Sequence, residues 1–342
     1  MTETPYGVPP TATTAGGTAH GEVSSDQVAW FAKTFDSLVA NVQKAILGKE
    51  HVTRLALTCL LSEGHLLLED VPGTGKTQLA RALAASVQGT HGRIQFTPDL
   101  LPSDVTGVTI FDPETRRFEF HQGPIFATIV LADEINRASP KTQSALLEVM
   151  EEGRVTVDGV PHPVGTPFMV IATQNPIEQA GTYRLPEAQL DRFLMKTSLG
   201  YPDYDSSVRV LADAATRDRS SAVTPVVTAQ VVTGMAALAD RVHVDEALLG
   251  YVVRLAEATR SHPSLRLGLS MRGALAFVRC AKTWAASHGR TEVVPEDITT
   301  LAPPVLGHRV LLEAEAQFAG ATVDGVIEEI LASVSPPERR AR

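Results

Sequence analysis

The sequence predicts an α/β fold, in which a mainly parallel sheet covered by helices on both faces is followed by a smaller all-helical domain. Three observations support this prediction. Short apolar runs alternate with helical patterns up to about residue 200, and a glycine-rich turn joins the first such run to a helix. After Tyr201 and Pro202, apolar runs of strand type stop and only helical patterns follow.

The elements can be assigned in chain order. Residues 1–25 are rich in Thr, Gly, Ala and Pro, which predicts a disordered tail. Helical periods begin at Asp26, over Glu50–Leu61 and over Lys76–Val87. Buried parallel strands are expected at five short apolar runs: His65–Glu69, Arg93–Phe96, Thr128–Ala132, Phe168–Ala172 and Met195–Leu199.

The second half of the chain is expected to be helical. We therefore predict a tail over residues 1–25, an α/β core over 26–200 and a helical lid domain over 201–342. The helices expected in the lid are Asp205–Ala215, Thr228–Leu238, Asp245–Arg260, Ser270–Ser287 and Pro295–Leu301.

Composition excludes several classes of protein. The formal net charge of −9 offers no broad basic surface, so a nucleic-acid partner is not favoured. There is no apolar run of 18 residues and no signal-peptide pattern, so we expect no membrane span and a cytoplasmic protein. The two cysteines, Cys59 and Cys280, are far apart in apolar helical patterns and predict neither a disulfide nor a zinc site.

A phosphate-binding motif lies between the first strand and the next helix. Residues 70–77 read DVPGTGKT, which is a Walker A pattern in its proper context. Gly73 and Gly75 let backbone N–H groups turn toward phosphate, Lys76 supplies charge to the β- and γ-phosphates, and Thr77 supplies a hydroxyl to Mg²⁺. One position departs from the strict pattern, because Asp70 stands where the motif has its first glycine. The motif predicts ATP and Mg²⁺ as cofactors.

Hydrolytic residues are expected at the ends of two later strands. Residues 129–134 read IVLADE, and the carboxyl end of a parallel strand is where ligands bind. Asp133 is placed to hold Mg²⁺, and Glu134 is placed to orient and deprotonate the attacking water. Asn175 follows the next strand, where its amide can hydrogen-bond both phosphate and water.

Together these motifs resemble the AAA+ ATPases, and two longer stretches resemble the MoxR family. The two stretches are residues 132–143 (ADEINRASPKTQ) and residues 185–193 (LPEAQLDRF). The resemblance implies a P-loop NTPase αβα sandwich that assembles into a ring, expected to be a hexamer, with ATP between subunits. It further implies that Arg192 reaches the γ-phosphate of a neighbouring subunit and that Arg272 contacts phosphate in its own subunit.

The resemblance also implies further contacts and partners. Residues around Ile46 and Gly48 are expected to wrap the adenine, and two inserts are expected at Pro98–Gly123 and in a hairpin over Arg154–Pro163. A protein with a von Willebrand factor A domain and a protein client are the expected partners of a chaperone-like motor in complex assembly or metal insertion. The remaining loop residues assigned to the nucleotide are Pro72, Thr74 and Gln78.

Other interpretations stay open at this point. A helicase or chelatase motor shares the core and the insert pattern, and DNA-stimulated hydrolysis would favour the helicase. A non-catalytic nucleotide-binding scaffold is a third class, against which the intact Lys76, Asp133 and Glu134 weigh. Arg192 could instead form an ion pair with a nearby acid such as Glu187 or Asp191, and Arg272 could be structural.

Overall fold

The computed structural model describes residues 22–175, 182–212 and 219–337, which form two compact units. The predicted tail, residues 1–25, lies outside the described residues except for its last four. The domain limits predicted from the sequence stay a prediction. Among the described residues, the first unit holds 37–193 and 197–233, and the second holds 22–36, 194–196 and 234–337.

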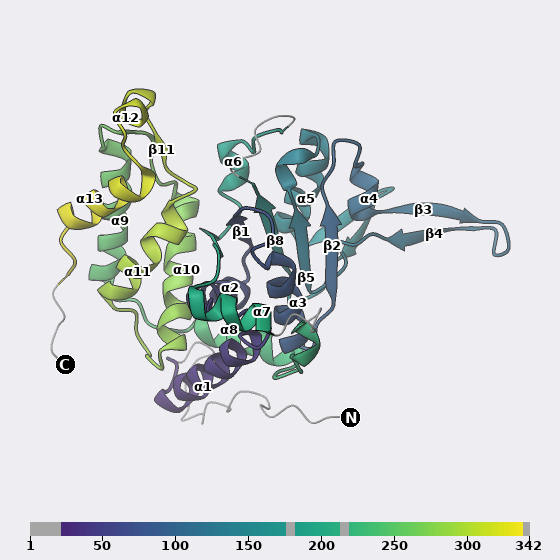
Figure 1. The fold of residues 1–342 in the computed structure, drawn as a ribbon, viewed down its shortest axis with the longest axis horizontal. Helices are drawn as coiled ribbons and strands as arrows, with labels where there is room; N and C mark the ends of the chain where they lie inside the picture. Colours follow the sequence, from purple (N-terminus) through teal and green to yellow (C-terminus); the bar gives the residue numbers. More distant parts are fainter. Residues whose placement is uncertain (1–21, 176–181, 213–218, 338–342) are drawn as a thin grey trace. The chain divides into compact units, whose positions relative to one another are not determined.

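A five-stranded sheet has the order β2–β5–β8–β1–β9, and its first four strands form the centre of the first unit (Figure 1). The pairs β2–β5, β5–β8 and β8–β1 are parallel, as the sequence predicts. In this order the two strands that carry the expected acids and Asn175 lie side by side, next to the strand that leads into the glycine-rich turn. The strands are β1 (Leu66–Glu69), β2 (His91–Gln95), β5 (Ile129–Asp133), β8 (Met169–Gln174) and β9 (Met195–Thr197).

Helices cover both faces of this sheet. Val130 and Ala132 of β5 join a buried cluster with Leu146 and Leu147 of α5 (Pro140–Glu152). The helix α3 (Lys76–Ser86) also packs against β5, but its own buried leucines lie outside this cluster, so it covers the opposite face. This arrangement confirms the predicted αβα fold class.

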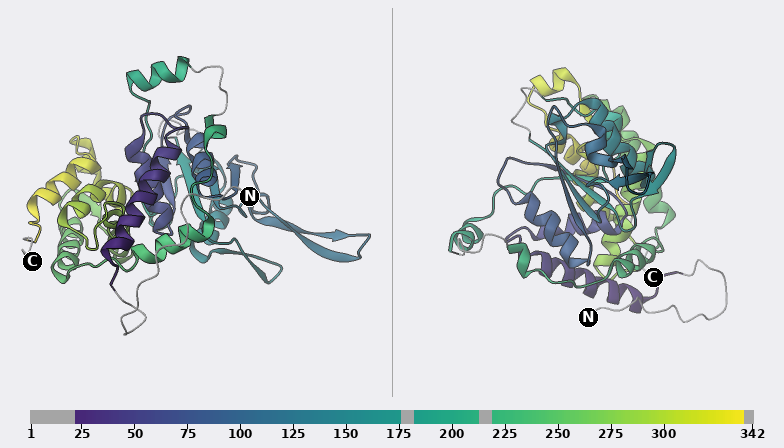
Figure 2. Two further views of the ribbon diagram at one scale, coloured as in Figure 1. Left: turned by 90° about the horizontal axis from the view of Figure 1, so that it is seen from below. Right: turned by 90° about the vertical axis from the view of Figure 1, so that its right-hand side faces the viewer.

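Two hairpins extend the first unit. β6 (Arg154–Val157) and β7 (Val160–Pro163) are joined by Asp158 and Gly159, both with left-handed backbones, which confirms the hairpin expected there. The insert expected over Pro98–Gly123 forms the short helix α4 (Pro102–Thr106) and a second hairpin. This second hairpin, β3 (Gly107–Asp112) with β4 (Arg117–Gln122), stands out from its unit as a long ribbon (Figure 2).

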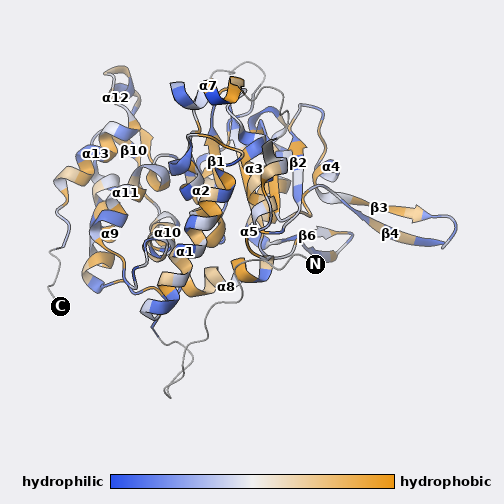
Figure 3. Cartoon of the chain, turned by 60° about the horizontal axis from the view of Figure 1, so that its bottom comes forward, coloured by the Kyte–Doolittle hydropathy of each residue, from blue (hydrophilic) through white to orange (hydrophobic). Residues whose placement is uncertain are grey.

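Aromatic side chains run along the β3–β4 hairpin. Phe111 and Phe118 meet edge to face near its exposed end, with ring centroids 5.3 Å apart. Phe120 stacks on His162 of β7 at 4.0 Å, which joins the bases of the two hairpins. In Figure 3, hydrophobic colouring appears on β3 of this exposed ribbon as well as in the buried sheet.

The second unit is mainly helical and has its own core. The helices α9 (Glu246–Ser261), α10 (Met271–Ser287), α11 (Pro295–Leu306) and α13 (Val323–Ser333) pack against one another. Arg290 holds the nearly buried Asp297 through two hydrogen bonds of 2.6 and 2.5 Å, and the same carboxylate caps the start of α11.

One detail of the lid differs from the all-helical prediction. β10 (Leu265–Leu267) and β11 (Leu311–Leu312) form a small antiparallel sheet. Strands of two or three residues are too short to show an alternating pattern, so the sequence carried no signal for them.

Among the described residues, no helix combines the length and the apolar character needed to cross a bilayer. The other helices are α1 (Ser25–Val42), α2 (Glu50–Leu61), α6 (Glu187–Leu190), α7 (Tyr204–Ala212), α8 (Ala229–Ala239) and α12 (Ala314–Phe318).

Candidate functional site

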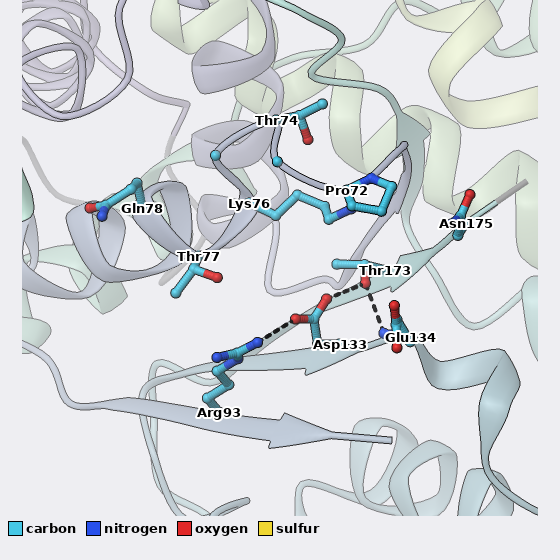
Figure 4. A pocket seen from close by; sticks show the side chains of 12 residues that line it. Pro72, Thr74, Lys76, Thr77, Gln78, Arg93, Asp133, Glu134, Thr173 and Asn175 are labelled. Atoms are coloured by element: carbon cyan, nitrogen blue, oxygen red, sulfur yellow. Dashed lines mark hydrogen bonds and ion pairs between the residues drawn. The ribbon is translucent and has the colours of Figure 1, made fainter. Parts of the chain in front are cut away.

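A cavity of about 380 Å³ lies at the carboxyl ends of β1, β5 and β8 (Figure 4). It brings together ten of the residues assigned to the nucleotide site from the sequence. Arg93 and Thr173 complete the lining and were not predicted. The ten predicted residues are Pro72, Gly73, Thr74, Gly75, Lys76, Thr77, Gln78, Asp133, Glu134 and Asn175.

The glycine-rich loop has the backbone that its sequence requires. Gly73 and Gly75 adopt φ values of +85° and +97°, which other residues reach only with strain. Gly75 is the N-cap of α3, so the helix begins at the cavity with its unpaired N–H groups. The Lys76 ammonium donates to the carbonyls of Asp70 and Val71 at 3.2 and 3.1 Å. Because an ammonium has three N–H donors, one remains for a phosphate oxygen.

Thr173 fixes both acids at the end of β5. Its hydroxyl donates to Asp133 Oδ1 at 2.7 Å and accepts from the backbone N–H of Glu134 at 2.9 Å. Glu134 has a left-handed backbone, φ +57°, which turns the chain sharply at the point where the strand ends. The Asp133 carboxylate and the backbone of Glu134 are therefore held on the cavity wall at the end of β5, and β8 lies between β5 and the strand β1 that leads into the loop (Figure 4).

Two polar residues of β2 hold these acids from the other side. Arg93 donates to Asp133 Oδ2 at 2.8 Å and to Gln95 Oε1 at 3.0 Å. Gln95 in turn donates to Glu134 Oε2 at 2.9 Å, and Arg137 forms an ion pair with the same oxygen at 3.1 Å. The sequence shows that Arg93 and Gln95 alternate with apolar residues and so share one face of the strand, but only the pairing of β2 with β5 brings them to the two acids.

Asp70, the departure from the strict motif, is explained by its contacts. The residue is 3% exposed, and its backbone is not in the left-handed region that would need glycine. Its carboxylate accepts from the hydroxyl of Ser198 at 3.1 Å and from the N–H groups of Leu199 and Gly200. The rear turn of the loop is thus tied to the segment that follows β9.

Four predicted site residues do not line the cavity. Ile46 packs beside the loop, since its Cδ1 lies 3.7 Å from the position of a Cβ on Gly75. Gly48 has φ +71°, and a Cβ there would approach the Ser206 hydroxyl to 2.5 Å, so the position requires glycine. Arg272 is the second residue of α10 in the second unit, and its role toward phosphate stays a prediction.

Arg192, the fourth, follows α6. Its guanidinium forms an ion pair with Glu151 of α5 at 2.9 Å, and both side chains are partly exposed. Among the described residues, no acceptor reaches its buried Nε. The partly exposed side chain lies outside the cavity of its own chain.

Comparisons with known proteins agree with this geometry. Residues 65–195 match the model for the ATPase family associated with various cellular activities (AAA), and residues 257–330 match the AAA lid domain. The chain is 39% identical over 322 residues to Chaperone MoxR1 of Mycobacterium tuberculosis, covering 90% of this chain and 84% of that protein. It belongs to the MoxR family of AAA+ ATPases.

Two further proteins are similar over most of their length. Uncharacterized protein YeaC of Bacillus subtilis is 48% identical over 303 residues, which cover 89% of this chain and 95% of YeaC. The solved structure of a proposed ATPase from Cytophaga hutchinsonii has a TM-score of 0.84 and 37% identity, covering 91% of this chain and 97% of that one. The matches to MoxR1 and to the AAA model confirm the family resemblance seen in the sequence.

The residues of the cavity fit the nucleotide and the Mg²⁺ that this family implies. The left-handed glycines and the start of α3 form a cradle for phosphate, and no side chain of Gly73 or Gly75 fills it. One hydroxyl, Thr77, and one carboxylate, Asp133, are the kind of small oxygen donor set with which Mg²⁺ is held beside substrate phosphates.

Proposed function

We propose that this protein binds Mg²⁺-ATP in the cavity and hydrolyses it, as a ring-forming, chaperone-like motor of the MoxR type. The observation that carries the proposal is the placement of Asp133 and Glu134. Thr173 holds both acids on the wall of the cavity that the phosphate-binding loop also lines. A scaffold that only bound nucleotide would not need the second acid.

The loop and Asp133 would bind the phosphates. Backbone N–H groups around Gly73 and Gly75 donate to phosphate oxygens, and Lys76 adds a point charge. Thr77 and Asp133 would hold Mg²⁺, which when bound neutralises charge on the β- and γ-phosphates. Arg93 keeps the Asp133 carboxylate aimed at this position through its 2.8 Å ion pair.

Glu134 would act on the water. Its carboxylate would orient the attacking water and take its proton as the bond from water to the γ-phosphorus forms and the bond from the γ-phosphorus to the β-phosphate oxygen breaks, with ADP as the leaving group. Asn175 lies on the same cavity wall, where its amide can donate to the γ-phosphate and accept from the water. The low exposure of Asn175, 9%, keeps this amide in a defined place.

A second subunit would complete the site. Arg192 lies outside the cavity of its own chain and its side chain is partly exposed, so its guanidinium suits a γ-phosphate bound by a neighbour in a hexameric ring. Ile46 and Gly48 would wrap the adenine, with Pro72, Thr74 and Gln78 completing the nucleotide contacts. Arg272 would reach the phosphates from the lid of the same chain.

The biological role is proposed from the family. The related MoxR1 is named a chaperone, which supports a protein client for this chain. We further propose a partner that carries a von Willebrand factor A domain, a role in complex assembly or metal insertion, and a cytoplasmic location. The net charge of −9 supports a protein client over nucleic acid.

Two variants test the hydrolytic assignment. Glu134→Gln should bind ATP normally but turn over about 10²-fold more slowly, because the water loses its general base. Lys76→Ala should weaken nucleotide binding itself. Nucleotide titration and phosphate release are measured on both, with Glu148→Gln, an exposed acid of α5, as the matched control. Turnover of Glu134→Gln equal to that of the wild type contradicts the assignment.

A further inference from the structure

Asp70 makes contacts that binding of phosphate alone does not require. We propose that Asp70 is a positioning residue that couples the state of the phosphate-binding loop to residues 198–203, the segment leading from β9 to α7. The inference deepens the proposed ATPase function and rests on it. It identifies the residue through which bound nucleotide acts on the chain beyond the sheet.

The carboxylate of Asp70 is committed to that segment. It is buried, and it accepts three hydrogen bonds, from the hydroxyl of Ser198 and the N–H groups of Leu199 and Gly200. A carboxylate that accepts several N–H or O–H groups holds them more strongly than a neutral acceptor does. The glycine of a strict Walker A loop could make none of these bonds, and the backbone at Asp70 does not need glycine.

The backbone of Asp70 is hydrogen-bonded to the residues that form the catalytic cavity. Its N–H donates to the carbonyl of Gln174 at 3.0 Å, and Gln174 directly precedes Asn175. Its carbonyl accepts from the ammonium of Lys76 at 3.2 Å. One residue thus joins the phosphate-binding lysine and the strand that carries Asn175 to residues 198–200.

This arrangement gives a physical route for coupling. One donor of Lys76 is spare, so an ammonium that contacts both the β- and the γ-phosphate gives up its bond to the carbonyl of Asp70 or Val71, because the anion is the stronger acceptor. When the ammonium turns to phosphate, its hold on the rear of the loop weakens. Because the N–H groups of Leu199 and Gly200 donate to the buried carboxylate of Asp70, a shift of that turn moves these two residues as well.

The same segment is also held from the side expected to contact adenine. Lys49 Nζ donates to the carbonyl of Tyr201 at 2.6 Å. Asp203 accepts from both the N–H and the hydroxyl of Ser206, and Ser206 lies against Gly48. Residues 198–206 are therefore fastened to both parts of the chain that would hold the two ends of ATP.

Asp70→Gly is the direct test, because it restores the strict motif while removing the carboxylate. The loss of three charge-assisted bonds should lower kcat by about tenfold or more, while the affinity for a non-hydrolysable ATP analogue changes less than about threefold. Hydrogen exchange at Leu199 and Gly200 is the second readout. In the wild type the analogue should change exchange at these amides, and in Asp70→Gly this response should disappear.

Two serine variants keep the test decisive even if Asp70→Gly does not fold. Ser198→Ala removes one of the three donors and should reduce kcat and the exchange response by about threefold. Ser207→Ala is the matched control, because its hydroxyl donates to the Pro202 carbonyl and not to Asp70. It should match the wild type in both readouts.

The outcomes separate this inference from the proposed function. The inference is overturned if the analogue does not change hydrogen exchange at Leu199 and Gly200 in the wild type. It is also overturned if Asp70→Gly keeps the kcat of the wild type and the same change in hydrogen exchange on binding the analogue. If the wild type hydrolyses ATP and either result is found, only the coupling is wrong. A nucleotide-dependent exchange response without any hydrolysis supports the coupling and contradicts the proposed ATPase function.

Discussion

Gln95 donates a 2.9 Å hydrogen bond to Glu134 Oε2, from β2 to the end of the neighbouring strand β5. Arg137 binds the same oxygen, so two donors compete there with the water that Glu134 would activate. Gln95 does not line the cavity, and Gln95→Ala removes one of the two donors that compete with the water for Glu134. We expect basal ATP turnover to rise about fivefold with unchanged nucleotide affinity, since one hydrogen bond is worth about 1 kcal/mol.

Phosphate release and nucleotide titration measure both effects. Gln95→Glu provides the contrasting variant, because it keeps the length of the side chain but removes the amide donor and places a second negative charge beside Glu134. A Gln95→Ala protein that hydrolyses ATP no faster than the wild type shows that the hydrogen bond does not restrain Glu134.

The ionisation of Cys280 should lower the stability of the second unit as the pH becomes alkaline. Burial raises the pKa of its thiol to about 12, whereas a thiol in an unfolded chain has a pKa of about 8.5. The folded form therefore keeps its proton over a range in which the unfolded form loses it. This contribution to stability is complete below about pH 8.5 and is lost, by about 1.4 kcal/mol per pH unit, as pH rises toward the folded-state value.

Cys280→Ala isolates that contribution. Denaturant unfolding at several pH values between about 8 and 11 compares the variant with the wild type, and the difference between them should shrink as pH rises. Cys59→Ala serves as a control for removal of a buried thiol from the first unit. A difference that stays constant with pH rules out the raised pKa of Cys280.

ATP should promote assembly, because in the proposed ring each nucleotide lies between two subunits. Light scattering with and without a non-hydrolysable analogue measures the mass directly. Lys76→Ala should respond less to the analogue, since it binds nucleotide weakly. A protein that stays monomeric at tens of micromolar in both conditions counts against the ring.

The strands and the phosphate loop could be predicted from local sequence alone. The structure of the apolar run at β5 and of the glycine-rich loop is determined by residues close in sequence, so a local pattern predicts each of them. The strand β10 carries none, because it is defined by pairing with distant β11. The β3–β4 hairpin was expected only as part of an insert and not as two strands, since its polar and aromatic residues alternate on a ribbon that is exposed on both faces.

The site shows the same division. The residues of the loop and the two acids were expected from their motifs and line one cavity, while their catalytic roles stay predictions. The hydroxyl of Thr173 and the donors on β2 were missed, because their importance comes from which strands lie side by side. The contacts of Asp70 span more than 120 residues of sequence, a separation that no local pattern reports.

The central claim is that each ATP site is completed by Arg192 of a neighbouring subunit. Arg192→Ala alone should bind ATP nearly normally and hydrolyse it about 10³-fold more slowly, because the charge that builds in the transition state is no longer neutralised. Lys76→Ala should also be inactive, for lack of nucleotide. Glu151→Gln, which breaks the ion pair but keeps the arginine, is the matched control and should retain most of the activity.

The decisive measurement is the specific activity of mixtures of Arg192→Ala and Lys76→Ala at fixed total protein. A mixed interface can pair the intact loop of one variant with the intact Arg192 of the other, so activity should rise to a maximum at intermediate ratios. A line that stays near zero at every ratio, with mixed rings confirmed by native mass spectrometry, would contradict the shared site and leave Arg192 as the partner of Glu151 alone.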